Sequence, residues 1–327
     1  MKHQLTIALL LLIGFSGCLE TQSSKGQEPP IDAPPSASPV NRNQVISLTG
    51  HVLPPKEFPD RLLEQREEQL KNAQNKYEKD PDSLENIIWY GRRLGYIGRY
   101  QDAIRIFSVG LDLYPNSYKL LRHRGHRYIT TRQFDKAIED LQRAAFYARP
   151  VVNAMEPDGL PNRLNKPISN NKFNIWYHLG IAYYLKGNYD KALSSFKQCQ
   201  DYADNDDLKV AVADWSYMTY RKLGNQIGAK EAIAPIGRRM DIIENYSYHQ
   251  RILMYKGQYE AESLLQNAEG SNNSIHPTLG YGIACYYLNE GQVDKAREIY
   301  QLILKNDQWD AFGYIASEAD VLSISKL

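Results

Sequence analysis

The sequence has few cysteines and almost no net charge. Three of its 327 residues are cysteine, and 39 lysines and arginines nearly cancel 38 aspartates and glutamates. Cys199 and Cys285 are far apart and each lies in an apolar helical pattern, so we predict small core residues and no disulfide framework. A neutral chain has no global field to gather nucleic acid. We therefore expect no nucleic-acid partner.

Long hydrophobic runs are also scarce. The apolar run LTIALLLLIGF at residues 5–15 has 11 residues, which is too short to span a bilayer but suits a signal-peptide core. It ends in FSGC at residues 15–18, which resembles the lipobox of bacterial lipoproteins, although Phe15 stands where that family usually has leucine. The resemblance implies that residues 1–17 are a signal peptide and that Cys18 is lipidated. Leu19 follows the cysteine, which by the same resemblance favours the periplasmic face of the outer membrane over the inner membrane; a simple secretory signal is the alternative.

Common catalytic and metal-binding motifs are absent. The chain has no H-E-x-x-H and no G-x-x-x-x-G-K-[ST], and the part after the signal peptide has no nucleophile elbow. His123, His126 and His178 could meet in space, but no cysteine or carboxylate nearby in sequence completes a zinc site with them. We predict no enzymatic activity, no cofactor and no metal. An enzyme with an unrecognised site near His126 and His178 is a less favoured alternative.

The first part of the exported chain is rich in proline. Eight of the 16 prolines fall between Pro29 and Pro59, among small and polar residues. Such a segment cannot bury enough apolar surface to offset its ordering entropy. We predict a lipidated, flexible tether at residues 18–59, within which residues 45–53 could make a short extended contact with the folded body. Helical pattern begins near Asp60 and stops at Asp80-Pro81.

A short motif then recurs at intervals near 34 residues. It consists of glycine, any residue, an aromatic or apolar residue, two more residues and alanine. The copies are GRYQDA from 98, RQFDKA from 132, GNYDKA from 187, GNQIGA from 224 and GQVDKA from 291, with GQYEAE from 257 as a worn copy. The starts at 98 and 132 are 34 residues apart, and those at 224, 257 and 291 are 33 and 34 apart. Such a period signals stacked helical hairpins, with glycine in the tight turn and alanine where two helices approach. The motif predicts an all-α fold.

The segment WYHLGIAYYLKGNYDKALSSF resembles the tetratricopeptide repeat (TPR) family. Trp176, Leu179, Gly180 and Tyr183 match the family pattern W-x-x-L-G-x-x-Y. The resemblance covers about residues 60–322 and implies an α-solenoid of stacked antiparallel helix pairs over residues 60–327, with about five to six repeats. The repeats at 207–243 and 247–268 are degenerate and could each be one helix short.

Two features interrupt the array. An inserted loop at 150–172 separates the second and third repeats, and its four prolines and Pro-Asp-Gly turn favour a fixed course. It could cover or flank the binding groove. At the end of the chain, an apolar helical face predicts a capping helix at 309–322 that covers the last repeat, with Glu318 and Asp320 off that face.

The TPR resemblance also implies that the first helix of each repeat lines a concave groove. The candidate groove contacts are Arg92, Tyr96, Arg122, His126, Tyr177 and Tyr184. At about 100° per residue, Arg122 and His126 share one helical face, whereas Arg124 and Arg127 point away from it. Guanidinium groups suit carboxylates, and tyrosines pack on an extended chain. For each of these residues the alternative is a solvated side chain or one paired with a nearby acid.

Together these features predict a non-enzymatic adaptor lipoprotein of the bacterial cell envelope. It would bind a protein or peptide through the groove and the membrane through its N-terminal lipid. A small-ligand or glycan-binding envelope component is the alternative, and it would need a closed, aromatic-lined pocket.

Overall fold

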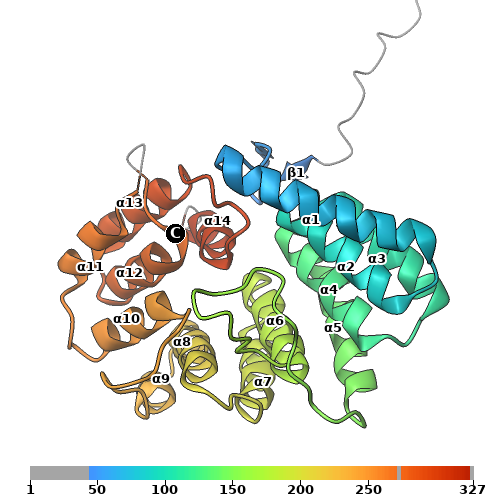
Figure 1. Cartoon of the computed structure of the whole chain (residues 1–327). Coiled ribbons are helices and arrows are strands. Elements are labelled where there is room, and N and C mark those ends of the chain that lie inside the picture. Colours follow the sequence, from blue (N-terminus) through green and yellow to red (C-terminus); the bar gives the residue numbers. More distant parts are fainter. Residues whose placement is uncertain (1–43, 271–273, 325–327) are drawn as a thin grey trace, which may run out of the picture. The chain divides into compact units, whose positions relative to one another are not determined.

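A short β-hairpin and a series of helices make up the described part of the chain, residues 44–270 and 274–324, in the computed structural model (Figure 1). The strands β1 (Val45–Ile46) and β2 (Val52–Leu53) pair antiparallel, with Val45 opposite Leu53. The predicted signal peptide, Cys18 and the tether up to residue 43 lie outside these residues. Over the described ranges, no helix has both the length and the apolar character needed to cross a membrane.

The helices follow one another as stacked pairs (Figure 1). They are α1 (Asp60–Lys79), α2 (Leu84–Tyr96), α3 (Tyr100–Leu113), α4 (Tyr118–Thr130), α5 (Phe134–Ala148), α6 (Asn171–Leu185), α7 (Tyr189–Gln200), α8 (Asp206–Lys222), α9 (Gln226–Ile233), α10 (Tyr246–Tyr255), α11 (Ala261–Ala268), α12 (Pro277–Asn289), α13 (Val293–Ile303) and α14 (Phe312–Ile324). Each of the first helices α2, α4, α6, α8 and α10 contacts the next first helix in the series, ending at α12. The predicted all-α fold of stacked helix pairs is confirmed. The two degenerate repeats both keep two helices, but their second helices, α9 and α11, have only eight residues each.

Close packing inside a pair depends on a small residue in its first helix. In the third repeat, a Cβ atom added to Gly180 on α6 would lie 2.4 Å from the ring of Phe196 on α7. The ring therefore fills the space that any other residue would need. Cys199 and Cys285 are buried and unpaired in the described chain, as small core residues.

The turn inside each pair places one residue in the left-handed region of backbone conformation. Five of these turns have glycine with φ between 68° and 81°, at Gly98, Gly187, Gly224, Gly257 and Gly291. The α4–α5 turn has Arg132 instead, with a φ of 61°. A non-glycine residue there costs roughly 1–2 kcal/mol, so other contacts must hold it in place.

Contacts with α14 hold Arg132. Its guanidinium binds the Glu318 carboxylate through two hydrogen bonds of 2.8 and 3.1 Å and donates a third, of 2.8 Å, to the Trp309 carbonyl. The Arg132 and Glu318 side chains are 4% and 1% exposed, so this ion pair is almost completely shielded from solvent. We call the pair the Arg132 clasp.

Two predictions about α14 need correction. The helix spans Phe312–Ile324 and not 309–322, and its charged residues are not on an exposed face. Glu318 joins the clasp, and Asp320 is 4% exposed and pairs with Lys222 at 2.7 Å. The reason is that α14 packs against α6 as well as α12 and α13, so more than one of its faces is covered.

The predicted flexible tether does not extend to residue 59. Residues 44–59 pack on the folded body, where Val45 and Leu53 join the core at 3% and 7% exposure. Lys56 pairs with Asp310 at 2.8 Å, and the Trp309 indole donates to the Pro54 carbonyl at 2.9 Å. Two buried apolar side chains and these polar contacts outweigh the effect of a proline-rich composition.

Candidate functional site

A cavity of about 200 Å³ lies between α2, α4 and the loop at 149–170. Its basic lining is Arg92 from α2 and Arg122 and Arg127 from α4, and we call it the arginine cavity. Tyr96 and His126 also line it. Four of the six predicted groove residues, Arg92, Tyr96, Arg122 and His126, thus meet in one place.

Arg127 also lines the arginine cavity, and the prediction that it points away was wrong. Its guanidinium lies over the ring of Tyr100, 5.3 Å from the ring centroid. No hydrogen bond or ion pair joins its guanidinium to another described residue, although the Asp310 carboxylate acts on it electrostatically from farther away. A helical wheel places Arg127 on another face of α4, but the long side chain reaches around the helix into the space left between α2 and α4. Arg124, in contrast, does point away and pairs with Asp140.

A buried polar chain runs from Arg122 to the loop. Arg122 Nη1 donates to His123 Nδ1 at 2.8 Å, and Arg122 Nη2 lies 3.2 Å from Glu156 Oε1. Because Nδ1 accepts this bond, the proton of neutral His123 is on Nε2, which faces the same Glu156 oxygen at 4.0 Å. The other Glu156 oxygen accepts from Asn174 at 2.9 Å. Asp158 lines the cavity as well, so two acids face three arginines and the cavity keeps a small excess of positive charge.

Two arginines of α2 bind the backbone of the loop. Arg92 donates to the Pro157 carbonyl at 2.7 Å, and Arg93 donates to the Gly159 carbonyl at 2.8 Å. Gly159 lies so close to Tyr96 that an added Cβ would be 1.9 Å from the phenol oxygen. The loop is thus seated on the row of first helices, and it lies across the surface where the sequence predicts an open groove.

Asparagines hold the two ends of the loop. It spans 149–170 and not 150–172, because α5 ends at Ala148 and α6 begins at Asn171. Asn170 caps α6 and also donates to the Tyr202 carbonyl, and Asn171 donates to the Ala154 carbonyl at 2.9 Å. Farther along, Asn162 donates to Glu244 just before α10. Sequence reasoning missed Glu156 as a site residue. A lone glutamate in the long prolyl loop, upstream of the Ser-Asn-Asn run, was the available signal.

The predicted meeting of His126 and His178 does occur. Their ring centroids are 4.3 Å apart, and both rings lie beside Phe312 of α14. Burial lowers the pKa of His123, His126 and His178 well below the usual 6.5, and the nearby guanidinium groups lower it further. The three rings are therefore neutral at physiological pH. Within residues 44–270 and 274–324, no three or more metal-ligating side chains gather at one place.

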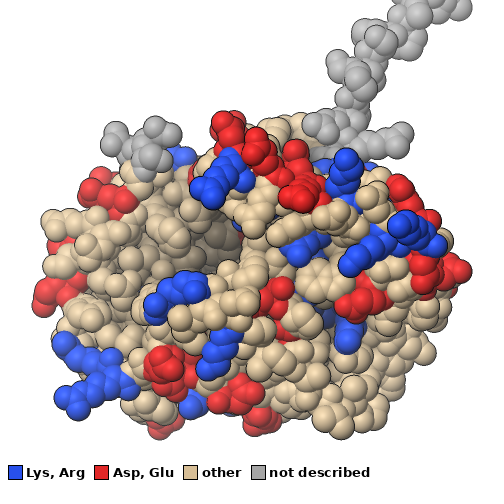
Figure 2. Space-filling view, viewed as in Figure 1, with Lys and Arg blue, Asp and Glu red and all other residues tan. Residues whose placement is uncertain are grey.

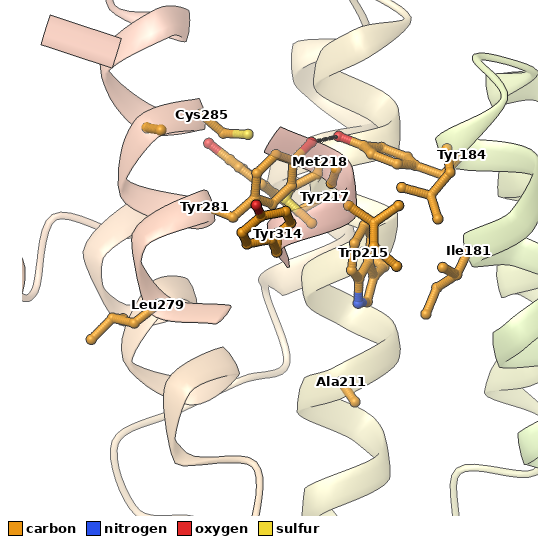
Figure 3. Close-up of a cluster of buried hydrophobic side chains, with 14 of the residues drawn as sticks. Ile181, Tyr184, Ala211, Trp215, Tyr217, Met218, Leu279, Tyr281, Cys285 and Tyr314 are labelled. Atoms are coloured by element: carbon orange, nitrogen blue, oxygen red, sulfur yellow. Dashed lines mark hydrogen bonds between the residues drawn. The ribbon is translucent and has the colours of Figure 1, made fainter. Parts of the chain in front are cut away.

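The last two predicted groove residues, Tyr177 and Tyr184, are core residues. Tyr177 is 7% exposed and bonds Tyr248 and Trp215 through its hydroxyl. Tyr184 is 3% exposed, and its hydroxyl meets that of Tyr281 at 2.7 Å beside Trp215 (Figure 3). The assignment of both to the groove is incorrect. Trp215 of α8 and Tyr248 of α10 cover Tyr177, and Trp215 and Tyr281 of α12 cover Tyr184.

Charges on the visible face do not form a field of one sign. Figure 2 shows basic and acidic side chains interspersed over it. The positive charge of the site comes instead from the few arginines inside the arginine cavity, so it acts only on a group that enters there.

Comparisons with known proteins agree with this architecture. Tetratricopeptide repeat family models match residues 173–206 and 279–307. These two segments, which hold α6–α7 and α12–α13, are therefore tetratricopeptide repeats. No curated protein sequence matches it.

Several solved structures are similar. A crystal structure of MamA has 16% identity and a TM-score of 0.42, over 62% of this chain and 100% of its own. MamA from Desulfovibrio magneticus RS-1 has 19% identity and a TM-score of 0.41, over 54% and 86%. YrrB, described as a TPR protein with an unusual peptide-binding site, has 14% identity and a TM-score of 0.39, over 78% and 98%.

Proposed function

We propose that this chain is a non-enzymatic adaptor that binds an acidic segment of a partner protein at the arginine cavity. The two matched TPR segments support a protein-binding role, because TPR arrays serve as interaction scaffolds. The finer proposal is that the adaptor is an envelope lipoprotein, anchored through Cys18 on the periplasmic face of the outer membrane. It is supported by the lipobox-like FSGC stretch.

The observation that carries the proposal is the convergence of arginines from two consecutive repeats on one cavity. Arg92 and Arg122 are held by the loop, whereas no described acid lies within ion-pair distance of Arg127, and Asp310 acts on it only from farther away. A guanidinium presents several donors that match a carboxylate, and such a charge-assisted bond contributes about 1.5–3 kcal/mol. Arg127 is therefore the residue best placed to bind a partner's carboxylate.

The test is crosslinking in membranes, followed by identification of the partners of wild type and of Arg127→Glu. We expect the main partner to be reduced at least tenfold, since about 1.4 kcal/mol corresponds to a factor of ten. Arg297→Glu is the matched control, because Arg297 on α13 is half-exposed and pairs only with exposed Asp294. Identical partner lists for Arg127→Glu and the control would refute the site.

A second candidate function is the binding of a small anionic ligand. It is favoured by the enclosure of the cavity by the loop and by the rings of Tyr96 and Phe107 in its lining. Native mass spectrometry of protein purified from the envelope separates the two functions. A stoichiometric small molecule that is lost in Arg127→Glu would favour the ligand-binding function over the adaptor.

A further inference from the structure

The loop binds the arginine cavity through the same groups that a peptide partner would use. Glu156 offers a carboxylate to Arg122, and the Pro157 and Gly159 carbonyls accept from Arg92 and Arg93. A short acidic peptide binds a row of guanidinium groups in the same way, through one side-chain carboxylate followed by carbonyls of extended backbone.

This fit leaves polar atoms without partners. Arg122 Nε and Asp158 Oδ2 are buried and have no hydrogen bond among the described residues. Leaving a buried polar atom unsatisfied costs about 1–3 kcal/mol. The loop is therefore bound less favourably than a ligand that satisfied these atoms.

The middle of the loop is also weakly packed. Leu160 and Leu164 are apolar but 47% and 53% exposed. Outside the cavity, this part of the loop is held by exposed hydrogen bonds, from Asn162 to Glu244 at 2.6 Å and from Arg163 to Tyr246 at 3.1 Å. The base of the loop is fixed by the buried Asn170 and Asn171, so the middle can lift once these exposed bonds break. Few buried apolar contacts mean a small free energy for local opening.

We propose that residues 156–159 are an internal stand-in for the partner, and that an acidic, extended segment of a partner protein displaces them to bind the arginine cavity. This inference rests on the proposed function and adds its regulation. The partner class is a segment with a glutamate or aspartate followed by backbone carbonyls that Arg92 and Arg93 can bind. A cavity of about 200 Å³ admits one such side chain and not a folded surface.

The loop has a large advantage over a free peptide because it is tethered to its own site. The effective concentration of a segment on a short linker is in the millimolar range. Weakening the loop's own contact should therefore raise the affinity for a peptide added in solution.

The test uses the full chain in detergent and a fluorescent peptide with the loop's own sequence, NAMEPDGLPN, residues 153–162. We expect the Glu156→Gln protein to bind this peptide at least tenfold more tightly than wild type does. A control peptide with glutamine in place of the glutamate should bind at least tenfold more weakly to the same variant. Gly159→Val is the second variant: its side chain would collide with Tyr96 and expel the loop without changing charge. It should show the same gain.

Two results would overturn the stand-in. One is the absence of peptide binding to both folded variants, with far-ultraviolet circular dichroism as the check on folding. The other is equal affinity of both peptides, or of variants and wild type, which would mean that Glu156 does not compete for the site. If the peptide fails but Arg127→Glu still abolishes partner crosslinking, only the stand-in falls. If Arg127→Glu also leaves crosslinking unchanged, the adaptor site falls with it.

Discussion

Replacing Arg132 with glycine separates two opposite effects on stability. The substitution relieves the left-handed backbone conformation, which should gain roughly 1–2 kcal/mol. It also removes one partner of the buried Arg132 clasp and leaves Glu318 with a backbone donor, the Leu48 N–H at 3.2 Å, but no ion-pair partner. Breaking a buried pair in this way costs about 3–5 kcal/mol. We therefore expect Arg132→Gly to lower the free energy of unfolding by about 1–4 kcal/mol.

Urea titration followed by tryptophan fluorescence measures this change, since Trp309 lies over the Arg132 guanidinium at 5.6 Å. The double variant Arg132→Gly with Glu318→Gln should recover most of the loss, because no uncompensated charge stays buried. Gly291→Arg is the control for strain alone, because its turn has a φ of 77° and open space around it. That variant should lose roughly 1–2 kcal/mol. An Arg132→Gly protein as stable as wild type would refute the reasoning, because the clasp would then contribute no more than the strain costs.

Three further predictions concern pH, the lipid and the cavity. Burial lowers the pKa values of His123, His126 and His178 in the folded chain, so the unfolded chain binds more protons as the pH falls through 6.5. The free energy of unfolding should therefore fall between pH 7.5 and 5.5, by about 1.4 kcal/mol for each histidine. In urea titrations at the two pH values, His126→Gln should reduce the difference in the free energy of unfolding by the contribution of one histidine. An unchanged difference would show that the pKa of His126 is not lowered in the folded chain. Cys18→Ser should abolish incorporation of radiolabelled fatty acid and release the protein from the membrane fraction, and retention of both would exclude lipidation at this residue. Arg127→Lys should weaken binding of an acidic partner in a pull-down, because a lysine cannot form the two parallel bonds of a guanidinium, whereas equal binding would indicate a point-charge contact only.

The arginine cavity was only partly accessible to sequence reasoning. The repeat pattern placed Arg92, Tyr96, Arg122 and His126 on corresponding positions of successive first helices, and these four residues line one cavity in the structure. Arg127 was missed, since a helical wheel describes where a Cβ points but not how far a long side chain reaches. Glu156 was missed because a loop has no periodicity from which its position could be predicted.

The sequence by itself determined the local architecture. The period of the GxxxxA-like motif determined where the helix pairs lie. Glycine determined the left-handed conformation in five of the turns inside pairs, and Gly180 determined the close packing of α6 on α7 in the third repeat. These properties depend on residues within one or two helices, so they can be recognised in a short stretch of sequence.

Only the tertiary structure decided which polar and aromatic residues are buried. Glu318 pairs with Arg132 across 186 residues, and Tyr184 meets Tyr281 across 97. Whether a tyrosine faces a groove or a core depends on which helices from distant repeats cover it, and a repeat pattern is the same in both cases. The stacking of helices that are far apart in sequence therefore determined the buried ion pairs, the occupied arginine cavity and the course of the loop across the first helices.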